Sequence, residues 1–323
     1  MDTHEKETFM STYDWANEWT TLPWSHAEPT LFLSEICRLR IPGKALDIGC
    51  GAGTDSVFLA QQGWDVTSLD FVPKALEFTQ QRAEKAGVSV TAVEADITQW
   101  EPSTQFDLVL DHGLLHNMDP VRYSAYRDCV LKALAPDADF ILLHWHPLFK
   151  NQADGKMGPT RVDRKEIKSF FAPELQERFF AREEFEDLTS MVGGGMVQAY
   201  YWFRPNQAYH QPTKLLEQIE SSLSRHNIDF ENLIKTNIPN DVSDDLLKVM
   251  LGPGRFGIHH EEISDSQIAE ILMKFASSAG RKVEHVEKLL KIFASEDAGS
   301  ICSENARCDV CDVSFCKRLR YAK

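Results

Sequence analysis

The loop near residue 50 constrains the fold of this chain more than any other segment. An apolar strand that contains Asp47 leads into it, and the residues from Asp55 onward have the composition of a helix. The loop itself holds three glycines, Gly49, Gly51 and Gly53. Glycine is needed where the backbone turns sharply and where no Cβ can stand between the backbone and a ligand. A strand, a glycine-rich turn and a helix in this order predict a nucleoside site over the carboxyl end of a parallel sheet.

Acidic residues follow the next three predicted strands. The strand over residues 64–69 ends at Asp70, close to the spacing of about 20 residues at which an acid reaches ribose hydroxyls. Two later strands also lead to acids, residues 88–93 to Asp96 and residues 106–110 to Asp111. Because parallel strands bring their carboxyl ends to one edge of a sheet, we expect these carboxylates to line one site.

Strands and helices alternate along the first 205 residues. The helix predicted over residues 73–85 begins with Pro73 and ends before Gly87, which are typical start and stop signals. Later strands are predicted over residues 139–147 and 196–203. The alternation predicts an α/β fold, in which helices cover both faces of a mostly parallel sheet.

The glycine spacing distinguishes two kinds of nucleotide site. In a dinucleotide-binding loop the third glycine follows the second by three residues, but Gly51 and Gly53 are only two residues apart. With its successive strand-end acids, the chain resembles class I S-adenosylmethionine-dependent methyltransferases. The resemblance implies a Rossmann-like sheet of seven strands over residues 29–205, with S-adenosyl-L-methionine as the cofactor.

The resemblance also implies roles for individual residues. The first acid and the glycines are expected to surround the methionine part of the cofactor: Asp47, Gly49, Gly51 and Gly53. Asp70 is expected to bind the ribose hydroxyls, and Asp96 is expected to face the adenine. Three further residues are expected beside the cofactor: Phe71, Ile97 and Asp111.

Tryptophans mark an N-terminal arm over residues 1–28. Trp15 and Trp19 are four residues apart, so we expect them to share one face of a helix that Pro23 ends. Two interpretations are open, in which the rings either pack the arm onto the domain or form a lid that keeps water from the cofactor. The Trp-x-x-x-Trp element followed by Pro-Trp resembles the thiopurine and tellurite-resistance type of small-molecule methyltransferase, which implies that Trp19 and Trp24 cover the cofactor.

The loop after the fourth strand carries the candidate catalytic residues, Asp111, His112 and His116. Its Asp-x-Gly-x-x-His pattern is similar to that of the same small-molecule methyltransferases. Methyl transfer is an in-line displacement, so aligning the acceptor with the methyl group can supply on the order of 7–11 kcal/mol. A base is needed only for an acceptor that arrives protonated. The alternative for each side chain is a hydrogen-bonding or helix-capping role.

The chain beyond residue 205 shows no family resemblance. Apolar residues recur at helical spacing in four segments, residues 214–223, 245–250, 266–275 and 283–290. They predict a helical accessory domain over residues 206–298, with a partner protein as one candidate ligand.

Four cysteines crowd the final segment, residues 299–323: Cys302, Cys308, Cys311 and Cys316. A Cys-x-x-Cys pair with one more cysteine on either side supplies a tetrahedral set of thiolates. Zinc is the predicted occupant of this set. An iron–sulfur cluster, free or redox-active thiols, and a receptor for a soft metal or metalloid are the alternatives.

Composition narrows the class of partner. The chain has 34 basic and 49 acidic side chains and a net charge of -15, which disfavours nucleic acid as a ligand. No apolar run reaches the roughly 20 residues that span a bilayer. The N-terminus lacks the basic-then-apolar order of a secretion signal. The sequence therefore predicts no membrane association and a cytoplasmic location.

The predicted function is transfer of a methyl group from S-adenosyl-L-methionine to a small soluble acceptor. The resemblance favours a thiol or another soft nucleophile as that acceptor. Two alternatives stay open: a protein or peptide acceptor held by the C-terminal domain, and a non-catalytic scaffold that binds the cofactor.

Overall fold

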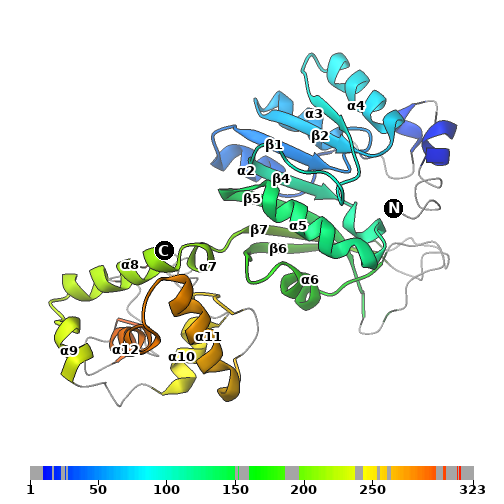
Figure 1. Ribbon diagram of the computed structural model, residues 1–323. Coiled ribbons are helices and arrows are strands. Elements are labelled where there is room, and N and C mark those ends of the chain that lie inside the picture. The colour runs from blue at the N-terminus through cyan, green and yellow to red at the C-terminus, as the bar shows by residue number, and fades with distance from the viewer. Residues whose placement is uncertain are drawn as a thin grey trace. The chain divides into compact units, whose positions relative to one another are not determined.

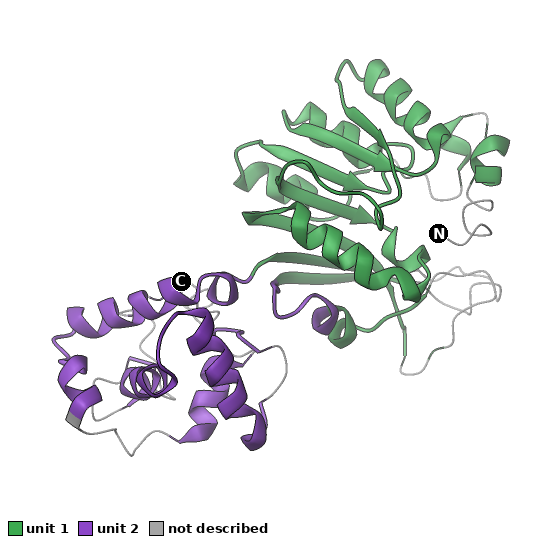
Figure 2. Ribbon diagram, viewed as in Figure 1, with its two compact units in different colours: residues 1–167, 177–205 green, residues 168–176, 206–323 purple. Residues whose placement is uncertain are grey.

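The computed structural model divides into two compact units. The residues that it describes are 10–16, 18–22, 26, 28–149, 152, 160–185, 196–236, 243–252, 255–259, 263–295, 301–302, 311 and 313. Unit 1 comprises residues 1–167 and 177–205, and unit 2 comprises residues 168–176 and 206–323 (Figure 2).

Unit 1 is built on a seven-stranded sheet (Figure 1). Its strands are β1 (Lys44–Ile48), β2 (Asp65–Asp70), β3 (Thr91–Glu94), β4 (Phe106–His112), β5 (Leu134–His146), β6 (Leu175–Phe185) and β7 (Met196–Pro205). Their order across the sheet is β3-β2-β1-β4-β5-β7-β6. The pairs β2–β3, β1–β2, β1–β4 and β4–β5 are parallel, and β7 runs antiparallel to β5. The predicted Rossmann-like α/β fold is confirmed.

Helices cover both faces of this sheet. They are α2 (Leu33–Leu39), α3 (Thr54–Gln61), α4 (Pro73–Lys85), α5 (Tyr123–Ala133) and α6 (Arg164–Phe171). Leu33 of α2 and Leu59 of α3 belong to one buried cluster with Leu110 of β4. On the opposite face α5, which lies in front of the sheet in Figure 1, brings Tyr126 to Asp111. Because side chains alternate along a strand, neighbouring residues of β4 face different helices.

Strands β3, β5 and β6 differ from the sequence-based expectation. Strand β5 begins at Leu134, five residues before the predicted start at residue 139. The third strand begins at Thr91, three residues later than the apolar pattern predicts. Strand β6 was not predicted, because charged residues interrupt its apolar pattern. By contrast, α4 has the predicted bounds, since Pro73 occupies its first turn and Gly87, with φ of +71°, follows its end.

In the N-terminal arm, the predicted helix that carries both Trp15 and Trp19 was wrong. Residues 10–15 are helical, but Trp19 lies in a separate 3-10 turn, η1 (Trp19–Thr21). Glu18, directly before that turn, has extended backbone with φ of -140°. Trp15 and Trp19 therefore do not share a helix face, and the Trp15 ring is 72% exposed.

The arm packs against the glycine loop and α4. One buried cluster joins residues of the arm to residues of those two elements: Tyr13, Ala16, Leu22, Ala52, Val72, Ala75 and Phe78. This contact agrees with the packing interpretation of the arm, and the lid interpretation stays a prediction.

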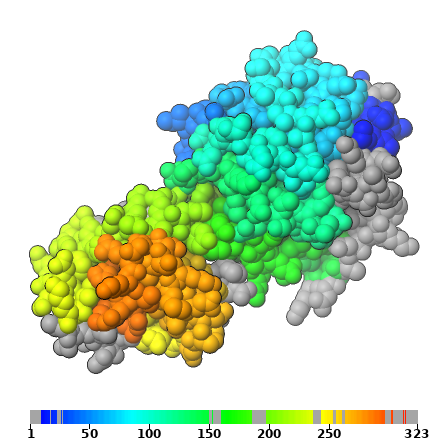
Figure 3. All heavy atoms as spheres, viewed as in Figure 1, coloured from blue at the N-terminus to red at the C-terminus, as the bar shows by residue number. Residues whose placement is uncertain are grey.

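Unit 2 is helical, as expected. Its helices are α7 (Gln207–His210), α8 (Pro212–Arg225), α9 (Phe230–Thr236), α10 (Asp244–Leu251), α11 (Asp265–Ser278) and α12 (Val283–Ala294). The four segments with helical spacing lie within α8, α10, α11 and α12. Leu216, Leu247 and Phe293 are fully buried members of its core. Side chains fill the spaces that the ribbon leaves between these helices (Figure 3).

Residues 168–176 group with unit 2, although the sequence predicts that they belong to the domain over residues 29–205. Gln176 Nε2 donates to Asn206 Oδ1 at 2.7 Å and to Phe256 O at 3.1 Å. Asn206 Nδ2 in turn donates to Pro173 O at 3.0 Å. These buried amide contacts tie the segment to the helical unit.

Within the described residues, the structure has no helix whose length and apolar character would allow it to cross a membrane.

Gly53 allows a test of the steric constraint on the loop. Its φ is +76°, and a Cβ at this position would lie 2.7 Å from side-chain atoms of Thr79. Gly53→Ala adds left-handed strain of about 1–2 kcal/mol to an overpacking cost of about 1–3 kcal/mol. We expect chemical denaturation to show that the free energy of unfolding of unit 1 falls by about 2–5 kcal/mol.

Gly87→Ala is the matched control. Gly87 has a similar φ of +71°, but no described atom lies within 4 Å of a Cβ built on it. This variant should lose only the conformational part, about 1–2 kcal/mol. Equal losses for the two variants would contradict the steric argument.

Candidate functional site

The candidate site lies where the strand order reverses, between β1 and β4. In open parallel sheets, ligands bind outside the carboxyl ends of the strands at this switch point. The glycine loop leaves β1 here and is tied to β2, since Gly49 and Cys50 donate backbone N–H groups to Leu69 O at 2.8 and 3.1 Å. Gly49, Gly51 and Gly53 all have positive φ. The loop thus presents backbone without Cβ atoms at the predicted site.

Asp70 ends β2 and holds the glycine loop. Its carboxylate accepts the backbone N–H of Gly51 at 3.0 Å and that of Val72 at 2.9 Å. Burial raises the pKa of Asp70 to about 6, although both hydrogen bonds oppose the rise. A carboxylate can accept about four hydrogen bonds. Asp70 therefore retains acceptor capacity for the predicted ribose contact.

Asp47 lies in β1, directly below the loop. Its Oδ2 accepts the hydroxyl of Ser56 at 2.6 Å, and Ser68 donates to the Ser56 hydroxyl at 2.8 Å. Burial raises the pKa of Asp47 to about 7, and the nearby charge of Asp55 raises it further in the same direction. A cationic ligand would relieve both effects, because an opposite charge favours the ionised carboxylate.

Asp96 and Ile97 follow β3. Asp96 Oδ1 accepts the backbone N–H of Thr98 at 3.0 Å and its hydroxyl at 2.8 Å, and it pairs with Arg122 at 2.5 Å. Burial raises the pKa of Asp96, but these partners outweigh burial and hold it below its ordinary value. Ile97 is buried. An ionised carboxylate accepts hydrogen bonds only, which suits a donor such as an exocyclic amine.

Asp111, at the end of β4, organises the loop that follows. Its carboxylate accepts the backbone N–H groups of Gly113, Leu114 and Leu115 at 2.9, 2.6 and 3.1 Å. It also accepts the hydroxyl of Tyr126 at 2.6 Å. Asp111 is fully buried, and burial raises its pKa to about 6. This geometry supports the hydrogen-bonding alternative for Asp111 rather than direct proton transfer.

His116 is a buried side chain in the turn η2 (Leu115–Asn117). Burial lowers its pKa well below the usual value for histidine, so the ring is neutral. Its ring meets that of His144 edge-on, with 5.5 Å between the centroids. Among the described residues, His116 Nδ1 has no hydrogen-bond partner.

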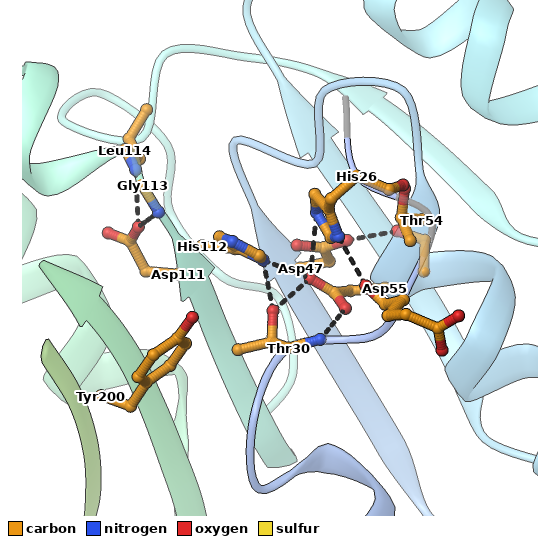
Figure 4. A network of polar contacts seen from close by, with 12 residues as sticks. His26, Thr30, Asp47, Thr54, Asp55, Asp111, His112, Gly113, Leu114 and Tyr200 are labelled. Carbon is orange, nitrogen blue, oxygen red and sulfur yellow. Dashed lines mark hydrogen bonds and ion pairs between the residues drawn. The ribbon is translucent and has the colours of Figure 1, made fainter. Parts of the chain in front are cut away.

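His112 belongs to a polar network that joins three segments (Figure 4). His112 Nδ1 lies 2.8 Å from Asp55 Oδ2. Asp55 also accepts the backbone N–H of Thr30 at 2.7 Å and its hydroxyl at 2.5 Å, and Thr30 Oγ1 contacts His112 Nδ1 as well. The His26 ring lies against that of His112 at an interplanar angle of 37°, with 4.1 Å between the centroids.

No sequence pattern predicts a role in the site for His26, Thr30 or Asp55. Asp55 stands in the first turn of α3, where an acid is usually read as a favourable partner of the helix dipole. Its burial, at 3% exposure, and its hydrogen bonds to Thr30 and His112 show that it has a more specific role. The three residues His26, Asp55 and His112 each place one potential metal-ligand atom within 4.8 Å of the others.

The aromatic residues predicted beside the cofactor are only partly described. Trp19 packs edge-on against Phe78 of α4, with 6.4 Å between the ring centroids, and Lys85 Nζ lies 5.6 Å from its ring centre. Phe71 is half-buried against the cluster that joins the arm to α4. Trp24 lies outside the described residues.

Two of the four predicted metal-ligating cysteines are described. Cys302 is buried, and its Sγ contacts Arg255 Nη1 at 2.6 Å. Cys311 is half-buried. Cys308 and Cys316 lie outside the described residues.

Comparison with known families identifies a domain within unit 1, which contains the candidate site. Residues 45–137 match a family model described as a methyltransferase domain. These residues extend from β1 into β5 and include the glycine loop, Asp70, Asp96 and the loop after Asp111. The predicted resemblance to methyltransferases is confirmed for this segment.

Individual relatives share the same region. A 2-heptyl-1-hydroxyquinolin-4(1H)-one methyltransferase of Mycobacteroides abscessus is 29% identical over 154 residues, which are 46% of this chain and 66% of that protein. Thiocyanate methyltransferase 1 of Brassica oleracea is 32% identical over 128 residues, 38% of this chain and 55% of that protein. A probable S-adenosyl-L-methionine-dependent methyltransferase, TehB of Haemophilus influenzae, is 32% identical over 69 residues, 21% of this chain and 24% of that protein. The chain spans less than two thirds of the length of each of these relatives.

The raised pKa of Asp47 predicts a pH-dependent effect on stability. The folded protein binds the Asp47 proton with a pKa of about 7, whereas the ordinary value of 3.8 applies to the unfolded chain. Because the folded state binds more protons between these values, the contribution of Asp47 to the free energy of unfolding falls as the pH rises from about 4 to about 7. Asp47→Asn removes this dependence.

Thermal denaturation without added ligand measures the effect. The stability of Asp47→Asn relative to the parent protein should increase as the pH rises from about 4 to about 7 and level off above it. Asp65→Asn, at the exposed start of β2, serves as the control and should show no such trend. A constant difference between the Asp47 variant and the parent across this range would contradict the assignment.

Proposed function

We propose that this chain, which contains a methyltransferase domain over residues 45–137, transfers a methyl group from S-adenosyl-L-methionine to a small soluble acceptor. The observation that carries this proposal is the glycine loop at the β1–β4 switch point, with Asp47 beneath it and Asp70 bonded to it. Bound S-adenosyl-L-methionine supplies an electrophilic methyl group on a positively charged sulfur.

The residues of the site fit such a ligand. Side chains at the positions of the loop glycines would meet close neighbours, since a Cβ on Gly49 would lie 3.0 Å from Leu114 and one on Gly51 would lie 3.2 Å from the Tyr13 hydroxyl. The buried Asp47 carboxylate favours a cationic partner, because its own pKa is raised by burial. Asp70 and Asp96 supply acceptors at the ends of β2 and β3, as the roles inferred from the sequence require.

Alignment is the main catalytic contribution that we assign to the chain. Asp111 fixes the loop after β4 through three backbone N–H groups. A fixed loop can hold an acceptor in line with the methyl group, and such orientation is worth on the order of 7–11 kcal/mol at best. His112 and His116 are the side chains of that loop that we retain as candidates for contact with the acceptor.

The class of acceptor is inferred from the relatives. Their names specify a hydroxyquinolone and thiocyanate, which are both small molecules with a nucleophilic heteroatom. We therefore propose a small nucleophile, with a thiol or another soft atom preferred, as the acceptor of this chain. The cytoplasmic location expected from the sequence stays a prediction.

We also propose that zinc binds the C-terminal cysteines. The support is the spacing of the four cysteines and the contact of the Arg255 guanidinium with Cys302 Sγ, since a neighbouring cation favours the thiolate that a metal requires.

Cofactor binding and turnover test the proposed methyl transfer. Calorimetry should detect binding of S-adenosylhomocysteine, and panels of thiols, inorganic anions and N-hydroxy heterocycles should yield S-adenosylhomocysteine from S-adenosyl-L-methionine. Asp70→Ala should weaken binding by about tenfold or more, because it removes charge-assisted hydrogen bonds worth about 1.5–3 kcal/mol. Asp65→Ala on the same strand is the control and should bind like the parent protein. An absence of binding by the parent protein would reject the proposed function.

Metal analysis tests the zinc proposal. The purified full chain should carry one zinc ion, and Cys308→Ser should lose most of it, since a tetrahedral site needs all four ligands. Cys129→Ser, which alters a buried cysteine of unit 1, should leave the zinc content unchanged. Full zinc retention by Cys308→Ser would refute this assignment.

A further inference from the structure

We propose that His112 is a general base for the methyl acceptor, held in its productive tautomer by Asp55 and Thr30, and that the acceptors of this chain carry a proton on the reacting heteroatom. Thiols and hydroxyl groups on nitrogen or on an aromatic ring belong to this chemical class. The inference rests on the proposed function and specifies its substrate.

Asp55 is built as a fixed, ionised acceptor. It accepts two hydrogen bonds from Thr30, one from the backbone N–H and one from the hydroxyl, and is 3% exposed. It also lies in the first turn of α3, where the helix dipole favours negative charge. Burial alone would raise the pKa of Asp55, but the hydrogen bond and charge of His112 outweigh it and leave the pKa below its ordinary value.

An ionised Asp55 determines the tautomer of His112. The carboxylate can only accept, so at 2.8 Å the proton between the two groups belongs to His112 Nδ1. In the neutral ring the lone pair then lies on Nε2. A carboxylate that orients a histidine and stabilises its charged form is the arrangement that makes imidazole an effective base in acyl-transfer enzymes.

The position of His112 places this base at the ligand-binding edge. It is the last residue of β4, beside β1, where the strand order reverses. It points to the α3 side of the sheet, whereas Asp111 points to the α5 side and is occupied by the loop. The His112 side chain is 21% exposed, so the ring is open to a small acceptor. In Figure 4 the hydroxyl end of Tyr200 points toward the same space.

The proposed step balances without another reactant. His112 Nε2 takes the proton from the acceptor X–H group while X forms a bond to the methyl carbon. The electron pair of the broken sulfur–methyl bond stays on sulfur, which becomes the neutral thioether of S-adenosylhomocysteine. Asp55 stabilises the resulting imidazolium, and the proton then passes to solvent.

The same residues fit a metal ion less well. Asp55 Oδ2 accepts two protons, one from Thr30 Oγ1 and one from His112 Nδ1, so its lone pairs are already engaged. Burial and the proximity of His112 lower the pKa of His26, so His26 packs against His112 as a neutral ring.

Among the described residues, charged and titratable groups near His112 lie in at least five segments of unit 1, and Arg82 of α4 interacts with its neighbours Asp55 and His26. Asp47 lies in β1, Asp55 in α3, His26 in the arm, His116 in η2 and Tyr200 in β7. Of these, only Asp55 is hydrogen-bonded to His112 Nδ1 and has a lowered pKa as an acid. Asp55 is thus the negatively charged group that contacts a protonated His112 directly.

Paired acceptors give the kinetic test. Benzyl mercaptan carries a proton at pH 7, whereas thiocyanate carries none. His112→Gln should lower kcat for the thiol by about 10²–10⁴-fold, the usual contribution of a general base, while kcat for thiocyanate and the Kd for S-adenosylhomocysteine should change by less than about threefold.

Asp55→Asn and Thr30→Val should lower the thiol rate and shift its pH profile. His146→Gln, at the end of neighbouring β5, is the control and should match the parent protein. Equal losses for both acceptors, or a matching loss of S-adenosylhomocysteine affinity, would overturn the proposal.

The tautomer provides a second readout that needs no turnover. Nitrogen-15 spectra of histidine-labelled protein at pH 8, assigned with His112→Gln, should show His112 protonated at Nδ1, and Asp55→Asn should shift the ring toward the Nε2-protonated form. A parent protein with His112 protonated at Nε2, or with a stoichiometric metal ion that His26→Gln and His112→Gln release, would overturn the proposal even if methyl transfer is observed. Failure to bind S-adenosylhomocysteine, together with the expected tautomer, would reject the proposed function and with it the role of His112 in methyl transfer, while the Asp55–His112 geometry would stand.

Discussion

Hydrogen bonding of buried carboxylates to backbone N–H groups is the interaction on which the site depends. A charged carboxylate buried without partners is costly, so each of these acids must be satisfied by the loop beside it. Asp70 fixes the glycine loop through Gly51, and Asp111 fixes the following loop through Gly113, Leu114 and Leu115. The strands supply the positions of the acids, and the acids in turn determine the course of the loops.

This arrangement also gives the site its charge preference. Burial raises the pKa values of Asp47, Asp70 and Asp111, which means that the folded chain holds anionic groups at the edge of the sheet at an electrostatic cost. A positively charged ligand reduces that cost, whereas an anionic one increases it. The same physical argument therefore accounts for the fit of a sulfonium ligand and disfavours a phosphate-rich one, independently of the net charge of the chain.

The sheet and the acids at its strand ends could be predicted from the sequence, because both follow from local patterns. The apolar run before Asp47, the glycines and the proline that starts α4 each act within a few residues. The sequence was not sufficient for the Thr30–Asp55–His112 network, whose members are 25 and 57 residues apart and meet only through packing. The prediction that Trp15 and Trp19 share a helix face was wrong for a related reason. Their spacing permits a shared face, but the extended backbone of Glu18 breaks the helix. Strand β6 was missed because charged residues, five of its eleven, interrupt the apolar pattern.

Strand alternation explains how one short segment can have two tasks. Asp111 and His112 are consecutive, and consecutive side chains of a strand point to opposite faces. Asp111 meets Tyr126 of α5 and is fully hydrogen-bonded, so it stabilises the loop. His112 meets Asp55 of α3 and keeps partial exposure. A shift of register by one residue would exchange these environments, placing the imidazole among the loop N–H groups and the carboxylate against Asp55, where two acids would repel each other. The pairing of β4 with β1 and β5 therefore fixes which residue supports the loop and which one remains open to a ligand.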